Sequence, residues 1–159
     1  MLKILREQLG QTLVLKLAGD VIEGTDFDQL IGKTAPDTQL NCKDITRMNS
    51  VGVKTWIKYF QKESKSGTKL RLVECSPAVV EQINLIVNFV CGGTVESIYL
   101  PYACKKCKKY LVKFSKVSDL KNSGLKAPVV ACDVCGGEAL FDDILEEYFL
   151  FMTRSGSSG

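Results

Sequence analysis

Two cysteine pairs of the form Cys-x-x-Cys, separated by 24 residues, constrain the fold of this chain more than any other feature. Two residues between the cysteines let both sulfurs of one tight turn reach the same ion, and two such turns complete a tetrahedral site of four thiolates. Gly136 and Gly137 follow the second pair and give its turn backbone freedom. The predicted ligands are Cys104, Cys107, Cys132 and Cys135.

The residues around these pairs resemble a zinc ribbon, with a strand at 110–114 and a return segment at 128–130. Four thiolates leave no coordination position for a catalytic water, so the predicted ion is structural zinc. We expect its removal to unfold the module. A dithiol redox pair lacks the expected surroundings, whereas an iron–sulfur cluster uses the same four ligands and stays an alternative. The remaining cysteines, Cys42, Cys75 and Cys91, are expected to pack as small apolar residues.

The first hundred residues alternate between strand-like and helix-like apolar spacing. This alternation predicts an α/β fold, with a mostly parallel sheet, right-handed crossovers and an antiparallel hairpin at its start. Strands are predicted at 2–7, 12–17, 40–48, 69–75 and 94–102, and helices at 27–31, from Asn49 or Ser50 to about Gly67, and from Pro77 to about 90.

Residues 40–52, Leu-Asn-Cys-Lys-Asp-Ile-Thr-Arg-Met-Asn-Ser-Val-Gly, are a strand-like stretch that ends in Asn-Ser-Val-Gly before a predicted helix. With two further stretches they resemble STAS domains, the anti-sigma factor antagonist family, whose strand ends in Asp-Ser-Ser/Thr-Gly before a helix. Residues 12–20 are similar to its opening strand and Gly-(Asp/Glu) turn, and residues 70–78 to its later strand and Ser-Pro-x-Val. The resemblance covers roughly residues 1–100 and implies a STAS-like sheet with helices.

In STAS proteins of this kind, the serine that matches Ser50 is phosphorylated by a partner kinase that is also an anti-sigma factor. The unmodified form docks through this loop and the following helix, and phosphate breaks the complex. The resemblance therefore implies that Ser50 is a switch, that Asn49 and Val51 shape its loop, and that Gly52 lets a partner backbone approach. Three positions depart from the family: Asn49 and Asn41 stand where it carries aspartate, and Val51 where it has serine or threonine. Two nearby carboxylates have become amides, which removes charge that a kinase or a phosphate would feel. The natural N-cap of the following helix is Asn49 or Ser50, and the alternative to a regulated Ser50 is that it only caps this helix.

Lysines recur along the predicted second helix, at Lys54, Lys58, Lys62 and Lys65. They predict either a solvated face or a surface for an acidic partner, with Lys54 and Lys58 nearest to the loop. Trp56 and Tyr59 lie on the same helix as core residues or as partly exposed anchors.

A second binding hypothesis comes from the ribbon. Residues 103–127 contain eight lysines and one acidic residue, Asp119, and Tyr110 and Phe114 offer rings for stacking. This pattern favours a nucleic-acid-binding adaptor as the alternative function. An enzyme is the least favoured class, because the chain has no histidine and the predicted metal has no open position.

The predicted organisation is a STAS-like domain at 1–102, a ribbon with a C-terminal helix (144–152) at 103–152, and a tail or tag at 153–159. That helix is predicted to dock on the sheet or to lie between chains, which leaves the oligomeric state open. No apolar stretch is long enough to cross a bilayer, and the N-terminus lacks the apolar centre of a signal peptide. We therefore expect a cytoplasmic protein of a bacterial signalling circuit.

Overall fold

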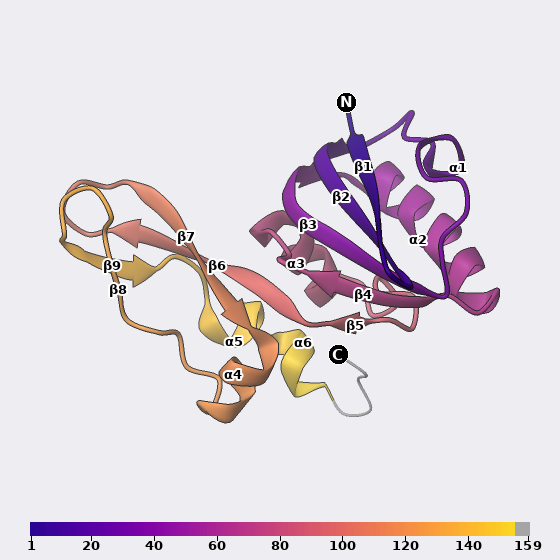
Figure 1. The fold of residues 1–159 in the computed structure, drawn as a ribbon. Helices are drawn as coiled ribbons and strands as arrows, with labels where there is room; N and C mark the ends of the chain where they lie inside the picture. The colour runs from indigo at the N-terminus through magenta and orange to yellow at the C-terminus, as the bar shows by residue number, and fades with distance from the viewer. Residues whose placement is uncertain (155–159) are drawn as a thin grey trace.

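The computed structural model of the chain describes residues 1–154, which form two sheets and their helices (Figure 1). The mixed α/β class predicted from the sequence is confirmed. The first sheet contains β1 (Lys3–Leu9), β2 (Thr12–Val21), β3 (Asp37–Met48), β4 (Lys69–Val73) and β5 (Thr94–Val95), with helices α1 (Phe27–Leu30), α2 (Ser50–Lys65) and α3 (Pro77–Leu85). The second contains β6 (Ser97–Cys104), β7 (Tyr110–Lys116), β8 (Val130–Ala131) and β9 (Glu138–Phe141), with α4 (Val117–Asn122), α5 (Leu145–Tyr148) and α6 (Leu150–Thr153).

The strands of the first sheet lie in chain order, β1-β2-β3-β4-β5. β1 and β2 form the predicted antiparallel hairpin, and each later strand is parallel to its neighbour. Every crossover advances one strand in the same direction, so right-handed connections place α1, α2 and α3 on one face of the sheet. The opposite face of the first sheet carries no helix from this part of the chain.

The core between this sheet and α2 is built on aromatic rings. Trp56 is 1% exposed and stacks on Phe89 with ring centroids 4.9 Å apart, and its indole N–H donates to the Phe89 carbonyl at 3.1 Å. Tyr59 is also buried, and its hydroxyl donates to the carbonyl of Gly32 at 2.7 Å. Both residues belong to the core, so reading them as exposed anchors is wrong.

The strand predicted at 94–102 is two strands in two sheets. β5 ends the first sheet, and β6 continues to Cys104 as a central strand between β7 and β9 (Figure 1). The N–H of Cys75 donates to Ser97 at 3.1 Å and that of Tyr99 to Cys75 at 2.8 Å, which fastens β6 beside the end of β4. The predicted boundary at 102 therefore falls inside a strand that joins the two modules directly.

The C-terminal segment packs against the first module. The predicted helix at 144–152 is two short helices, α5 and α6, docked on α3: the Asn84 amide donates to the Tyr148 carbonyl at 2.9 Å, and the Phe151 N–H donates to Asn84 Oδ1 at 2.9 Å. Thr153 ends α6, and the Arg154 guanidinium donates to the carbonyl of Ile83 at 3.1 Å. Thr153 and Arg154, which lie within the predicted tail, are therefore part of the folded structure, and the rest of the predicted tail, 155–159, lies outside the described residues.

Among residues 1–154, no helix has the length and apolar character needed to cross a membrane.

Candidate functional site

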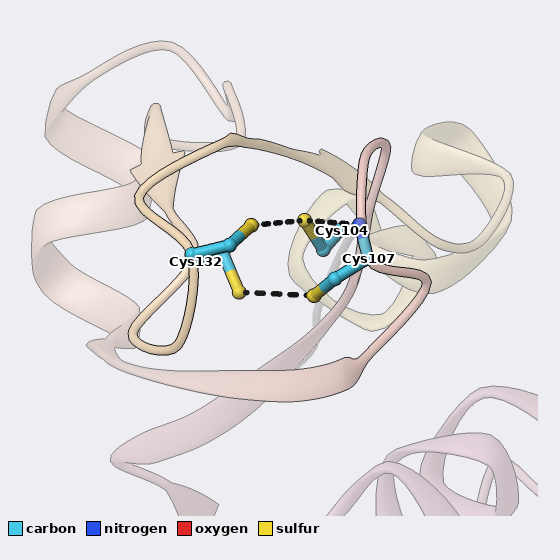
Figure 2. A group of neighbouring side chains, drawn as sticks. Cys104, Cys107 and Cys132 are labelled. Carbon is cyan, nitrogen blue, oxygen red and sulfur yellow. Dashed lines mark hydrogen bonds between the residues drawn. The ribbon is translucent and has the colours of Figure 1, made fainter.

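The four predicted metal ligands converge at the far end of the second sheet (Figure 2), where the sulfurs of Cys104, Cys107 and Cys132 turn toward one another. All four sulfurs lie within 4.8 Å of each other and none is in a disulfide. Cys104 Sγ lies 3.4 Å from Cys135 Sγ, and Cys107 Sγ lies 3.6 Å from Cys132 Sγ. Metal–sulfur bonds of about 2.3 Å in a tetrahedron place sulfurs about 3.8 Å apart. The cluster therefore has the size of a single-ion site.

The two turns that carry these cysteines have the same backbone hydrogen bonds. In the first turn, the Cys104 N–H donates to the Lys109 carbonyl at 2.8 Å and the Lys108 N–H to the Cys104 carbonyl at 3.1 Å. In the second, the equivalent bonds join Cys132 to Gly137 at 2.8 Å and Gly136 to Cys132 at 3.0 Å. Two copies of one turn thus face each other across the sulfurs.

Backbone N–H groups of both turns point at the sulfurs. The N–H of Cys107 lies 3.4 Å from Cys104 Sγ, the N–H of Val134 lies 3.4 Å from Cys132 Sγ, and the N–H of Gly137 lies 3.4 Å from Cys135 Sγ. Such bonds favour the thiolate, which is the form that binds metal.

These contacts divide the cysteines by pKa. The Cys107 N–H is the largest influence that lowers the pKa of Cys104 to about 6, and the Cys135 N–H is the largest that lowers the pKa of Cys132. The N–H of Lys109 lowers the pKa of Cys107, but the Cys104 sulfur, burial and the other facing sulfurs outweigh it, and that pKa rises to about 11. The neighbouring sulfurs therefore disfavour the thiolate of Cys107, and a cation bound between the cysteines would offset that cost.

The backbone after each pair takes the same unusual conformation. Gly136 has φ +72°, and Lys108, in the equivalent place of the first turn, has φ +66°. Gly137 has little room for a side chain, because an added Cβ would lie 3.2 Å from both Cys135 Sγ and Lys106 Cβ, which is tighter than an ordinary contact. The sequence marks the second turn with glycines, whereas nothing about a lysine marks Lys108.

The second candidate region is the start of α2, and Asn49 is its cap. Asn49 Oδ1 accepts from the N–H of Gly52 at 2.8 Å, while Ser50 is the first helical residue and is exposed. The reading of Ser50 as the helix cap is therefore wrong. The Asn49 amide also donates to Glu23 Oε2 at 2.6 Å and lowers the pKa of Glu23. An aspartate, which STAS domains usually carry there, would instead bring two carboxylates together.

Gly52 is buried and serves the packing of its own chain. A Cβ at this position would lie 2.0 Å from the carbonyl oxygen of Val21, at the end of β2. The backbone that approaches Gly52 is thus that of β2. Its neighbour Val51 is 48% exposed, and Lys54 and Lys58 are also exposed.

Comparison of the chain with protein-family models finds no match, and comparison with curated proteins finds none either.

Proposed function

We propose that this chain is a non-catalytic, STAS-like regulatory module that binds a partner protein through the exposed start of α2. The observation that carries the proposal is the exposure of Ser50, Val51, Lys54 and Lys58 on a helix whose other face is fully packed. Positions four apart on a helix are neighbours, so Ser50, Lys54 and Lys58 follow one line along its surface.

The charge of this line favours an acidic partner. Neither Lys54 nor Lys58 forms an ion pair with a described residue, whereas Lys62, one turn further on, is paired with Asp28 at 2.6 Å. Unpaired exposed lysines are available for complementary charges, which raise association rates and fix orientation. Val51 adds an apolar contact at the end of the same line.

Ser50 supplies a switch for this surface. Its place in the first turn of a 16-residue helix suits a phosphate, because unpaired N–H groups and the positive end of the helix dipole lie there. A phosphate would add about −2 charge beside Lys54 and repel an acidic partner. Phosphorylation would therefore weaken docking, as the resemblance to STAS domains implies.

We also propose that the ion held by Cys104, Cys107, Cys132 and Cys135 is zinc, in a structural role. Four thiolates in a tetrahedral arrangement, with N–H···S bonds from both turns, match the donor set of structural zinc sites. An iron–sulfur cluster needs the same ligands but absorbs visible light. Metal analysis together with an absorption spectrum of the purified protein separates the two. A colourless protein with one zinc per chain is expected, and a brown protein with iron and sulfide would overturn the assignment.

The docking proposal is tested by placing a photo-crosslinking residue at Val51 in the full chain, expressed in the cells that make it. We expect one crosslinked partner, and we expect the charge-reversal variant Lys54→Glu/Lys58→Glu to lose it. The control variant Lys113→Glu/Lys116→Glu also changes two lysines to glutamates, away from α2, and should keep the crosslink. Equal crosslinking in all variants would contradict a charged docking line on α2.

The switch is tested by intact mass spectrometry of protein recovered from the same cells, with and without phosphatase. A phosphatase-sensitive mass that disappears in Ser50→Ala supports the switch. Absence of that mass in every growth condition would leave Ser50 without a regulatory role.

A further inference from the structure

Strand β7 is an open edge of the second sheet. The strand order is β7-β6-β9-β8, so β7 pairs with β6 alone within residues 1–154. Seven residues long, it presents a row of backbone N–H and C=O groups that no other described element covers. Edges of this length bind further strands readily.

The side chains of β7 give this edge an apolar face. Tyr110, Val112 and Phe114 lie at alternate positions and therefore on one side of the sheet, and they are 54%, 42% and 43% exposed. Leu140 of β9, 48% exposed, shares that side, because Tyr110 and Leu140 both pair with Ala103. Contiguous exposed apolar side chains of this kind mark interaction surfaces.

Two cavities flank the C-terminal half of β7, and Phe114 and Lys116 line both of them. The first, of about 540 Å³, lies between β7, α4 and the edge of the first sheet. The second, of about 430 Å³, lies between β7 and the segment 119–128. A strand added beside the C-terminal half of β7 would direct successive side chains to opposite sides of the sheet, next to residues that line these cavities.

Both cavities are lined by more lysines than carboxylates. Lys113, Lys116 and Lys126 line the second cavity with a single carboxylate, Asp119. Lys116 lines the first together with Lys121, which has an interaction of its own, and with Glu96, which is paired with Arg71 at 3.2 Å. The surroundings of the β7 edge therefore favour negative side chains in whatever binds it.

We propose that β7 is the docking edge for an extended acidic segment of a partner protein, which pairs with β7 as an additional strand and places carboxylates in the two cavities. This mode of recognition takes affinity from main-chain hydrogen bonds and specificity from alternate side chains. The surface lies on the second module, away from α2, and is independent of the docking function proposed above.

The charges of β7 disfavour a second copy of this chain, since pairing two such edges would bring their lysines together. A single-stranded nucleic acid would satisfy the lysines and could stack on Tyr110 and Phe114. A nucleic acid cannot form a ladder of backbone hydrogen bonds with the unpaired N–H and C=O groups of β7, however. An acidic peptide strand can form this ladder and also place carboxylates near the lysines.

The probe is an N-acetylated peptide as long as β7, with valines in one half and consecutive glutamates in the other so that carboxylates point to both sides of the sheet, added to the isotope-labelled, metal-loaded full chain. We expect amide chemical-shift changes concentrated at residues 110–116 and slower hydrogen exchange of alternate β7 amides. Lys113→Glu/Lys116→Glu should weaken binding by about tenfold or more, because two attractions become repulsions. Lys3→Glu/Lys16→Glu, on the first sheet and outside both proposed surfaces, changes the net charge equally and should bind the peptide like the original chain.

Three results would overturn the proposal. One is equal affinity of the peptide for the β7 double variant and the original chain. A second is undiminished binding of a peptide N-methylated at alternate residues, which cannot form the ladder. The third is an oligothymidylate that binds the same amides more tightly than the peptide, since that result would make the surface a nucleic-acid site. Circular dichroism and metal content of each variant show that its fold is retained.

Discussion

Replacing Gly52 by alanine tests how closely α2 approaches β2. The added Cβ would lie 2.0 Å from the carbonyl oxygen of Val21 and 2.4 Å from its carbon, and both are backbone atoms that cannot rotate away. We expect the free energy of unfolding in urea to fall by about 3 kcal/mol or more. The matched control is Ser50→Ala, two residues earlier and exposed, which should change it by less than about 0.5 kcal/mol. Similar losses in both variants would show that no close approach exists.

Replacing Asn49 by aspartate tests the bond to Glu23. Aspartate caps a helix as well as asparagine does, but its carboxylate would face that of Glu23 where the amide now donates at 2.6 Å. We expect Asn49→Asp to destabilise the chain near neutral pH and to recover as acid protonates one carboxylate.

The original chain has the opposite pH dependence at this contact. Because the Asn49 amide lowers the pKa of Glu23, the stabilisation from this bond is present above the ordinary glutamate pKa and is lost as the pH falls through the lowered value. Urea midpoints of the original chain and of Asn49→Asp, measured across the acid range, test this difference. Asn49→Ser is the control, because serine caps the helix without a charge. A midpoint for Asn49→Asp that falls in parallel with that of the original chain would contradict carboxylate repulsion.

At the scale of single residues, the sequence predicts those roles that depend on residues nearby in the chain. The four cysteines are identified because their spacing alone brings sulfurs together. The sequence does not decide between Asn49 and Ser50 as cap, because both are favoured cap residues; the bond from the Asn49 amide to Glu23, 26 residues earlier, is visible only in the structure. The left-handed backbone conformation of Lys108 also cannot be predicted from its residue type. It is recognised only when its turn is compared with the facing turn, where Gly136 takes the same conformation.

At the scale of the metal-binding turn, Gly137→Ala tests the space around the sulfurs. The new Cβ would lie 3.2 Å from Cys135 Sγ and 3.2 Å from Lys106 Cβ, so the turn must shift its sulfurs. We expect metal affinity, measured by competition with a chromophoric chelator, to fall about 10- to 100-fold. Gly124→Ala strains a positive-φ residue with nothing within 4 Å of the new Cβ. It should lower stability and leave metal affinity unchanged, and equal affinity losses in the two variants would refute a local effect.

Among the elements, the strands and helices before residue 90 are predicted because apolar alternation and cap residues are local signals. Two elements of the second module are not. The apolar alternation of Ile98, Leu100 and Tyr102 predicts a strand but cannot say which sheet it joins. The break between α5 and α6 accompanies hydrogen bonds to Asn84, more than 60 residues away in the chain.

For the whole molecule, the structure predicts that metal removal unfolds only part of the second module. The turns at 104–109 and 132–137 depend on the sulfurs, whereas the base of the sheet belongs to the same hydrophobic core as the first module, with Ile98 and Leu100 fully buried and Phe149 2% exposed. After chelation we expect amides of both turns to lose protection from hydrogen exchange, while those at the start of β6 keep theirs.

The single tryptophan reports on the first module in the same experiment. Because Trp56 is 1% exposed and stacked on Phe89, its emission should stay unchanged when the metal is removed. A red shift on chelation, or loss of protection along the whole of β6, would show instead that the two modules unfold together.

The direct passage of the chain from β5 into β6 has a consequence for assembly. Where two binding modules are joined by a flexible linker, the effective concentration of one relative to the other depends on linker length. Here a strand fastened beside β4 and helices docked on α3 hold both modules in a common body. Molecules bound at α2 and at β7 would therefore be held at a fixed distance and angle from each other. A single partner could occupy both sites only if its own two binding segments were separated by that distance.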